Sequence, residues 1–384
     1  MHSDDALNEL MAMGRQDDQI QDAPHADFTL RTKVIQHPDF VRAIREIARI
    51  HFRWRKTGVA EGLMLHGQSG SGKTTLLEFY AQRFPMEFIE TRSDRGTERR
   101  ARIPILRVVT PESPTVKTLA EAFLEAMDDV GAGTGSANLK TKRIKLYMDR
   151  CQVELILVDE FHHFVERRQA AEASRVADWL KNLFNDCKRP VVLVGLPRAI
   201  MVLNGDTQLR RRFASPFYLP PFGFSTEEEQ ILFRALLQQF EEMLPHSPRN
   251  TRANLALSEP GMARRFYFAS NGLIDYVVKI LDDAASRRGA GLEGALTQAD
   301  LALAFRNQVW RDAPDQLNPF HPDAILRPLT HLHEPFAGWD DPHVYTQSPG
   351  TRPLAKKAGR GRPTVGSKRD HGLAVTQISA QATP

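Results

Sequence analysis

The chain has few cysteines and no long apolar run, and each shortage excludes a class of protein. Its two cysteines, Cys151 and Cys187, stand at no metal-ligand spacing, which argues against a cysteine-bound metal and fits a reduced cytoplasm. No run of 18 or more apolar residues occurs, so we expect no membrane-spanning segment. Residues 1–23 are polar and acidic and lack the apolar centre of a signal peptide. A cytoplasmic protein without membrane association is therefore expected.

Most of the chain also has no excess of positive over negative charge. The formal net charge of all 384 residues is +4, but residues 351–384 hold seven basic residues and one acidic residue. That segment carries +6, and residues 1–350 therefore sum to −2. Binding of nucleic acid must be argued from local clusters, because the body of the chain is not basic as a whole.

What the chain does have is a complete phosphate-binding motif in residues 62–75, GLMLHGQSGSGKTT. Every fixed position of the pattern G-x-x-x-x-G-K-[ST] is filled, an apolar strand pattern precedes it and a helical pattern follows it. Backbone N–H groups of such a loop bind phosphate oxygens. The ammonium of Lys73 should reach the β- and γ-phosphates, and the hydroxyl of Thr74 should bind Mg²⁺. We expect ATP to be held by Gly67, Gln68, Ser69, Gly70, Ser71, Gly72, Lys73, Thr74 and Thr75.

A second motif ends another buried strand pattern. Residues 155–158 are apolar and are followed by Asp159 and Glu160. In open α/β sheets, ligands lie at the carboxyl ends of the strands. We therefore expect Asp159 to bind the same Mg²⁺ as Thr74, and Glu160 to be the general base that orients the attacking water. His162 and His163 follow; a metal site would need more ligands nearby, so we expect them to pack or to form hydrogen bonds.

Three clusters of basic residues are candidates for binding or catalysis. Residues 90–102 predict an arginine-rich surface loop, and residues 139–151 predict a helix that starts with basic residues. Contact with phosphate and a merely solvated surface both remain open for these two. The DNA-binding candidates are Arg92, Arg95, Arg99, Arg100, Arg102, Lys140, Lys142, Arg143 and Lys145. The third cluster, Arg210, Arg211 and Arg212, is predicted to act on nucleotide held by a neighbouring subunit, with Arg211 as first choice.

The composition divides the chain into five parts. We expect a flexible lead over residues 1–25, an α/β nucleotide-binding domain over 26–222 and a helical lid over 223–310. Residues 311–350, rich in proline and aromatic residues, predict an extended strap that either wraps the body or awaits a partner. Residues 351–384 predict a disordered basic tail. Its GRGRP core resembles the AT-hook peptide, so Arg360 and Arg362 are expected in the minor groove of A·T-rich DNA; a solubilising tail is the alternative.

With both nucleotide motifs and the helical lid in place, the chain resembles an AAA+ ATPase over about residues 30–310. More narrowly it is similar to the TniB/TnsC family of transposition regulators, through the phosphate loop, the LILVDEFH stretch, the QLRRRF stretch and the lid segment SNGLIDYVVKIL. The resemblance implies a parallel sheet with helices on both faces. It also implies an ATP-dependent homo-oligomer, a ring or a helical filament, that coats double-stranded DNA. Its partners would be a transposase and a TniQ-like targeting protein.

Two departures from the AAA+ pattern predict slow, switch-like hydrolysis. The strand after residue 190 ends in Gly195 without a polar side chain, and the lid shows Asp275 in the region where an arginine often senses the γ-phosphate. Two alternatives to a transposition regulator remain: a helicase loader of the DnaC/IstB type, and a nucleotide-gated signalling scaffold that does not bind DNA. Salt-sensitive DNA binding that requires ATP would exclude the scaffold.

Overall fold

A computed structural model describes residues 29–93, 96–166, 170–205, 207–244, 255–288 and 296–338, with side chains left undescribed at 91–98 and 165–173. A five-stranded parallel sheet lies in the order β4-β5-β6-β1-β7. Its strands are β1 (Gly62–Gly67), β4 (Ile105–Val109), β5 (Leu155–Asp159), β6 (Val191–Gly195) and β7 (Phe217–Leu219). All strands run the same way, so the ends of β1, β5 and β6 share one edge, where both nucleotide motifs lie.

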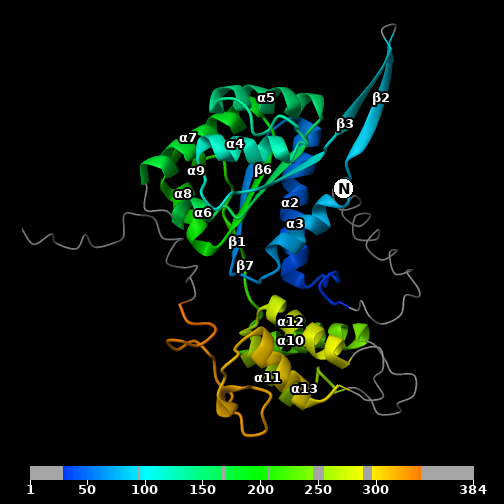
Figure 1. Cartoon of the computed structure of the whole chain (residues 1–384), viewed down its shortest axis with the longest axis vertical. Coiled ribbons are helices and arrows are strands. Elements are labelled where there is room, and N and C mark those ends of the chain that lie inside the picture. Colours follow the sequence, from blue (N-terminus) through cyan, green and yellow to red (C-terminus); the bar gives the residue numbers. More distant parts are fainter. Residues whose placement is uncertain are drawn as a thin grey trace, which may run out of the picture. The chain divides into compact units, whose positions relative to one another are not determined.

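Helices cover both faces of this sheet (Figure 1). On one face α2 (Pro38–Thr57) and α3 (Lys73–Ala81) pack on Leu63 and Leu65 of β1. On the other face α4 (Val116–Glu125), α5 (Ala137–Arg150) and α7 (Ala170–Cys187) share a core with Met64. Successive strand residues point to opposite faces, and every residue of β1 and β5 is buried. This is why these strands read as continuous apolar runs in the sequence.

Short elements complete the α/β part. They are α6 (His163–Glu166), η2 (Pro197–Ala199), α8 (Ile200–Gly205) and α9 (Thr207–Arg210). Among the helices of the described ranges, none is both long enough and apolar enough to cross a bilayer.

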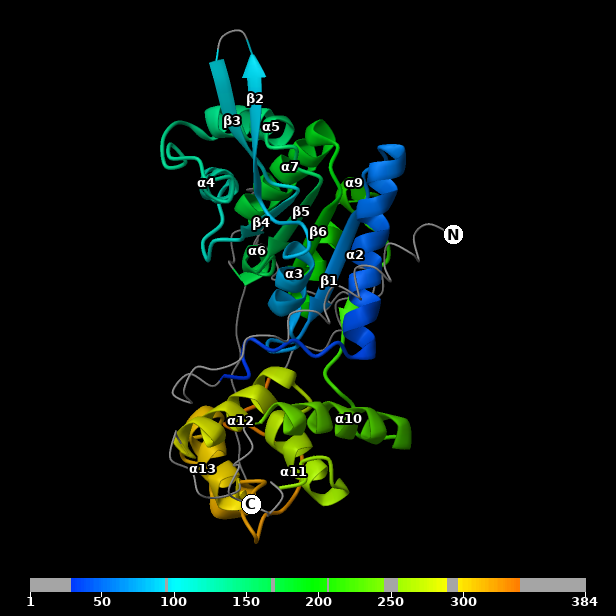
Figure 2. The same cartoon turned by 90° about the vertical axis from the view of Figure 1, so that its right-hand side faces the viewer.

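An antiparallel hairpin replaces the surface loop predicted for residues 90–102, so that prediction is wrong (Figure 2). Strands β2 (Glu87–Ser93) and β3 (Gly96–Arg102) pair with Glu87 opposite Arg102 and Glu90 opposite Arg99. The sequence shows a dense mixture of charges, but the ladder places acidic residues directly across from basic ones, and such cross-strand pairs stabilise a ribbon.

A separate apolar core joins four helices, α10 (Glu227–Met243), α11 (Pro260–Ser270), α12 (Ile274–Arg288) and α13 (Gln298–Gln308). Helix α10 begins with a capping box between Thr226 and Glu229, as its Thr-Glu-Glu-Glu start predicts. The described part of the predicted strap, which includes η4 (Asp315–Leu317), packs on these helices: Phe320, Leu329 and Phe336 are buried in their core. The strap was expected either to wrap the body or to await a partner, and residues 313–336 wrap the body.

One carboxylate connects three elements at the end of β5 that is opposite the nucleotide motifs. Glu154, just before β5, accepts hydrogen bonds from Arg55 of α2 at 2.6 Å and from Arg102 of β3 at 3.0 Å. It also lies 3.1 Å from Nε2 of His51, whose Nδ1 is 2.9 Å from the hydroxyl of Tyr80 in α3. Burial alone would raise the pKa of Glu154, but the bonds from His51 and Arg55 outweigh it and bring the pKa down to about 2.

We therefore expect Glu154→Gln to lower the thermal midpoint at pH 7 and to flatten the loss of stability in acid. A carboxyl whose pKa is depressed in the folded state stabilises above its unfolded pKa and loses that contribution as the pH falls through its folded pKa. The window here runs from the usual 4.5 down to about 2. Calorimetric midpoints between pH 7 and pH 2 provide the measurement. Glu61→Gln is the control, because its partners Arg49 and Arg53 are 41% and 52% exposed and such surface pairs contribute little.

Candidate functional site

The loop between β1 and α3 has the backbone that a phosphate cradle requires. Gly72 precedes α3 with φ of +87°, a conformation that residues with a Cβ rarely adopt. A Cβ on Gly67 would lie 2.5 Å from the carbonyl oxygen of Leu219, so only glycine allows this approach to β7. The hydroxyl of Ser71 is buried and has no hydrogen-bond partner within the described chain. The loop therefore has glycines at its tightest points and a polar atom left for a ligand.

Lys73 lies at the start of α3 with its ammonium turned back into the loop. Its Nζ donates to the carbonyl oxygens of Gly67 at 3.0 Å and Gln68 at 2.6 Å. Burial lowers the pKa of Lys73 to about 8, although the carboxylates of Asp159 and Glu160 act in the opposite direction. Its hydrogen-bond partners are neutral carbonyls, so a phosphate in the loop would give this buried cation the close anion that favours its charged form.

Two oxygen ligands from different motifs meet at the carboxyl edge of the sheet. The hydroxyl of Thr74 donates to Oδ2 of Asp159 at 2.9 Å. The other carboxylate oxygen, Oδ1, accepts from the backbone N–H of Glu160 at 2.8 Å. Oxygen donors that leave room for water and phosphate are what Mg²⁺ prefers. The pair predicted from sequence is thus brought together, and its chemistry fits that cation.

Glu160 follows Asp159 in a left-handed backbone conformation, with φ of +56°. Its carboxylate Oε2 is 3.2 Å from Nδ1 of His162 and 3.8 Å from Nε2 of His163. The histidines predicted to pack or to form hydrogen bonds therefore face the predicted general base. His162 is buried and lines the same cavity as Glu160.

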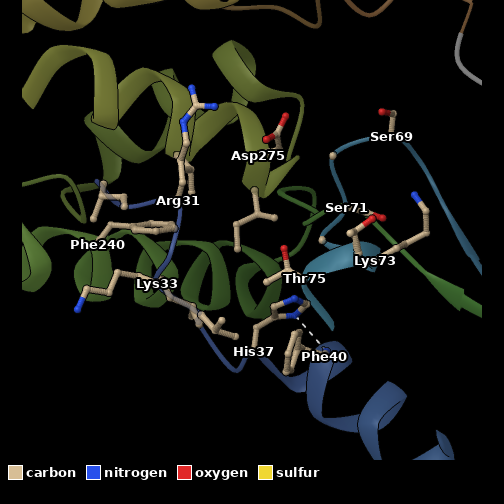
Figure 3. A pocket seen from close by; sticks show the side chains of 18 of the residues that line it. Arg31, Lys33, His37, Phe40, Ser69, Ser71, Lys73, Thr75, Phe240 and Asp275 are labelled. Carbon is tan, nitrogen blue, oxygen red and sulfur yellow. Dashed lines mark hydrogen bonds between the residues drawn. The ribbon is translucent and has the colours of Figure 1, made fainter. Parts of the chain in front are cut away.

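A cavity of about 420 Å³ is lined by Lys73, Thr74, Glu160 and His162, together with residues that carry no sequence motif (Figure 3). The segment before α2 contributes His37, whose Nδ1 accepts from the N–H of Phe40 at 3.4 Å. Burial lowers the pKa of His37 to about 4, so the imidazole is neutral at pH 7. Further apolar lining comes from Val34, Ile35, Leu196, Phe240, Ile274 and Val278. No motif in the sequence marks this wall of the cavity; Pro38 indicates a helix start but not a pocket.

The first turn of α12 closes over the phosphate loop. The backbone N–H of Asp275 donates to the carbonyl oxygen of Gly70 at 3.2 Å, and its carboxylate pairs with Lys279 at 2.6 Å. Asp275 lines the cavity in Figure 3, where the resemblance would place an arginine. A carboxylate here repels phosphate instead of sensing it, which agrees with the predicted departure.

The arginines of the QLRRRF stretch lie away from this cavity. Arg210, Arg211 and Arg212 are all exposed, and none of them lines it. Arg210 is held by the side-chain oxygen of Asn204. Contact with nucleotide would have to come from another subunit, and Arg211 and Arg212 have no ion pair among the described residues.

The predicted DNA contacts divide by exposure. In the hairpin, Arg99 stacks on Phe88 at 4.2 Å and Arg100 is exposed, whereas Arg102 binds Glu87 and Glu154. The side chains of Arg92 and Arg95 lie outside the described residues, as do Arg360 and Arg362.

The basic start of α5 is not the open surface that the sequence predicted. Lys140 has a side chain that is 0% exposed, and its ammonium donates to the carbonyl oxygen of Ala132 and pairs with Glu121, so it is withdrawn as a phosphate contact. Arg143 is paired with Asp129, and Lys145 with Asp186. Lys142 is exposed. The amphipathic pattern of α5 turns Lys140 inward, which its charge alone did not indicate.

One protein family and several solved structures resemble this chain. The family model described as "TniB: Bacterial TniB protein" matches residues 26–224. No curated protein sequence matches the chain. The ORC2 protein of Aeropyrum pernix, solved in ADPNP-ADP complexes, is 14% identical with a TM-score of 0.50, over 74% of this chain and 71% of that one. The ORC1 protein of Aeropyrum pernix in complex with DNA is 13% identical with a TM-score of 0.50, over 71% and 66%.

Cdc6p from Pyrobaculum aerophilum is 13% identical with a TM-score of 0.50, over 77% of this chain and 74% of that one. Identities this low show a shared fold alone. The predicted AAA+ fold, a parallel sheet with helices on both faces, is confirmed.

Proposed function

This chain belongs to the TniB family of bacterial proteins, and from that premise we propose that it is an ATP-dependent, DNA-binding regulator of DNA transposition. The proposed binding and hydrolysis of ATP are supported most directly by three groups that meet at one cavity: a lysine, a pair of oxygen ligands and a glutamate. Lys73 and Glu160 line it, and the Thr74 hydroxyl meets Asp159 at 2.9 Å beside them. A cation, a pair of oxygen ligands and a candidate base are the parts that phosphoryl transfer to water requires.

We assign roles to this chain's residues as follows. The loop N–H groups and Lys73 would hold the triphosphate, and Thr74 and Asp159 would hold Mg²⁺, which neutralises phosphate charge when bound. Glu160 accepts the proton of the attacking water. Gly195 has no polar side chain to orient the attacking water, and Asp275 has a carboxylate where an arginine would stabilise the γ-phosphate, so turnover is slow and suits a switch.

We further propose that the active form is a homo-oligomer, a ring or a helical filament, in which an exposed arginine of the QLRRRF stretch completes the neighbouring site. The oligomer would bind double-stranded DNA through the hairpin arginines and Lys142, and would recruit or activate a transposase with a TniQ-like targeting protein. Electron microscopy with duplex DNA and an ATP analogue tests this assembly. DNA-bound oligomers with the analogue and none with ADP are expected; oligomers that need the analogue but do not bind DNA would favour the nucleotide-gated scaffold.

The basic tail should contribute a separable part of the DNA affinity. Deletion of residues 351–384 removes up to seven cationic contacts. The slope of log affinity against log salt is negative, and each lost phosphate contact reduces its magnitude by about 0.9. The slope should therefore flatten by several units. Fluorescence anisotropy between low and moderate salt, with and without ATP analogue, measures it. A tail variant with Arg360 and Arg362 changed to Lys keeps the charge and should lose only the preference for A·T-rich duplexes. An unchanged slope after deletion would make the tail a solubility device.

A further inference from the structure

Three side chains at the end of β5 form a compact group of mixed ligands. Glu160, His162 and His163 each offer one ligand atom, and these atoms all lie within 4.8 Å of one another. From the sequence, His162 and His163 needed a further ligand nearby to form a metal site. Glu160 is that ligand, because its left-handed backbone turns the chain so that residues 160, 162 and 163 face the same point.

The two separations from Glu160 are close to those expected around a small tetrahedral cation. Bonds of about 2.0–2.1 Å to nitrogen and oxygen place tetrahedral ligands roughly 3.3 Å apart. The separations from Oε2 of Glu160 are 3.2 Å to Nδ1 of His162 and 3.8 Å to Nε2 of His163. The two imidazoles now stack with centroids 4.6 Å apart and planes 26° from parallel, so one ring has to turn before both present a nitrogen to the same ion.

The end of β6 holds this group in place. The N–H of Phe161 donates to the carbonyl oxygen of Val194 at 2.8 Å. A Cβ on Gly195 would lie 3.0 Å from the backbone nitrogen of His162. The glycine that leaves the end of β6 without a polar side chain therefore also makes room for His162.

We propose that Glu160, His162 and His163 bind a divalent transition-metal ion of the zinc type, with the fourth position open to the nucleotide cavity. Imidazole nitrogen favours such ions over Mg²⁺, whereas the Thr74–Asp159 oxygen pair favours Mg²⁺, so the two cations are sorted by ligand type. The inference rests on the proposed function in one respect. A metal on Glu160 withdraws the general base, so the ion stops hydrolysis while ATP stays bound.

Binding is tested on the full chain without a polyhistidine tag. Calorimetric titration with Zn²⁺ and the visible absorption of tetrahedral Co²⁺ should both show one site per chain. His163→Ala should weaken Zn²⁺ binding by roughly 100-fold, because even changes behind a metal ligand cost 10–100-fold. His331→Ala, at a histidine with a 71% exposed side chain, is the matched control and should bind as the wild type does. Equal Zn²⁺ affinity in wild type and His163→Ala would overturn the site.

Measurement of ATP hydrolysis distinguishes a failure of the metal site from a failure of the proposed ATPase function. With Mg²⁺ in excess, micromolar Zn²⁺ should inhibit the wild type and His331→Ala, and should inhibit His163→Ala far less. If no variant hydrolyses ATP with Mg²⁺ alone, the proposed ATPase fails, and the Co²⁺ spectrum still decides the metal site. Zn²⁺ inhibition that is equal in wild type and His163→Ala would overturn the proposed control of Glu160.

Discussion

Glu160→Gln should bind ATP as the wild type does and hydrolyse it about 100-fold more slowly or worse. The amide keeps the size and polarity of the side chain but cannot accept the proton of the attacking water, and the loss of a general base typically costs 10²–10⁴-fold. Backbone contacts to Asp159 are unchanged, because Oδ1 of Asp159 binds the N–H of residue 160 and not its side chain. Nucleotide should therefore persist on the protein and hold it on DNA.

Single-turnover hydrolysis and equilibrium ATP binding measure the two effects separately. Lys73→Ala is the opposite case, because it removes the buried cation of the loop and should abolish or strongly weaken binding itself. Glu46→Gln, at an exposed carboxylate of α2 paired with Arg49, controls for loss of one negative charge. A Glu160→Gln enzyme that turns over at the wild-type rate would remove Glu160 from its assigned role.

Arg211→Ala should reduce ATP hydrolysis by ~10³-fold or more while leaving ATP binding intact, since an arginine supplied in trans contributes 10³–10⁵-fold to phosphoryl transfer. Arg211 is exposed and does not line its own subunit's cavity, so we expect it to act on the nucleotide of a neighbouring subunit. Mixing Arg211→Ala subunits with Lys73→Ala subunits should restore some activity. In such oligomers an intact phosphate loop from the first subunit meets an intact Arg211 from the second.

The matched control mixes Arg211→Ala with the double variant Lys73→Ala/Arg211→Ala. That mixture holds intact loops but no Arg211, and it should stay inactive. Recovery is read as steady-state phosphate release at concentrations where mixed oligomers form. No recovery in the first mixture would count against Arg211, and the same experiment with Arg210→Ala and with Arg212→Ala would then test the other two exposed arginines.

The sequence by itself determined the parts of this protein that depend on neighbours along the chain. The phosphate loop is contiguous, so its glycines, Lys73 and Thr74 define both the backbone and the ligand set. Buried parallel strands read as apolar runs, and this placed β5 before Asp159 and Glu160. The helix start at Thr226 was visible because a cap is a local hydrogen bond.

Only the tertiary structure decided which of the other side chains meet. His37 and Phe240 lie far from the loop in sequence and reach its cavity through packing alone. Lys140 and Arg143 belong to the same basic stretch, but the helix turned the first fully inward and left the second half-buried in a pair with Asp129. The pairing of Glu160 with His162 and His163 depends on one left-handed residue after β5. Local patterns fix backbone conformation, whereas burial and convergence are settled by contacts between distant segments, and no spacing along the chain encodes those.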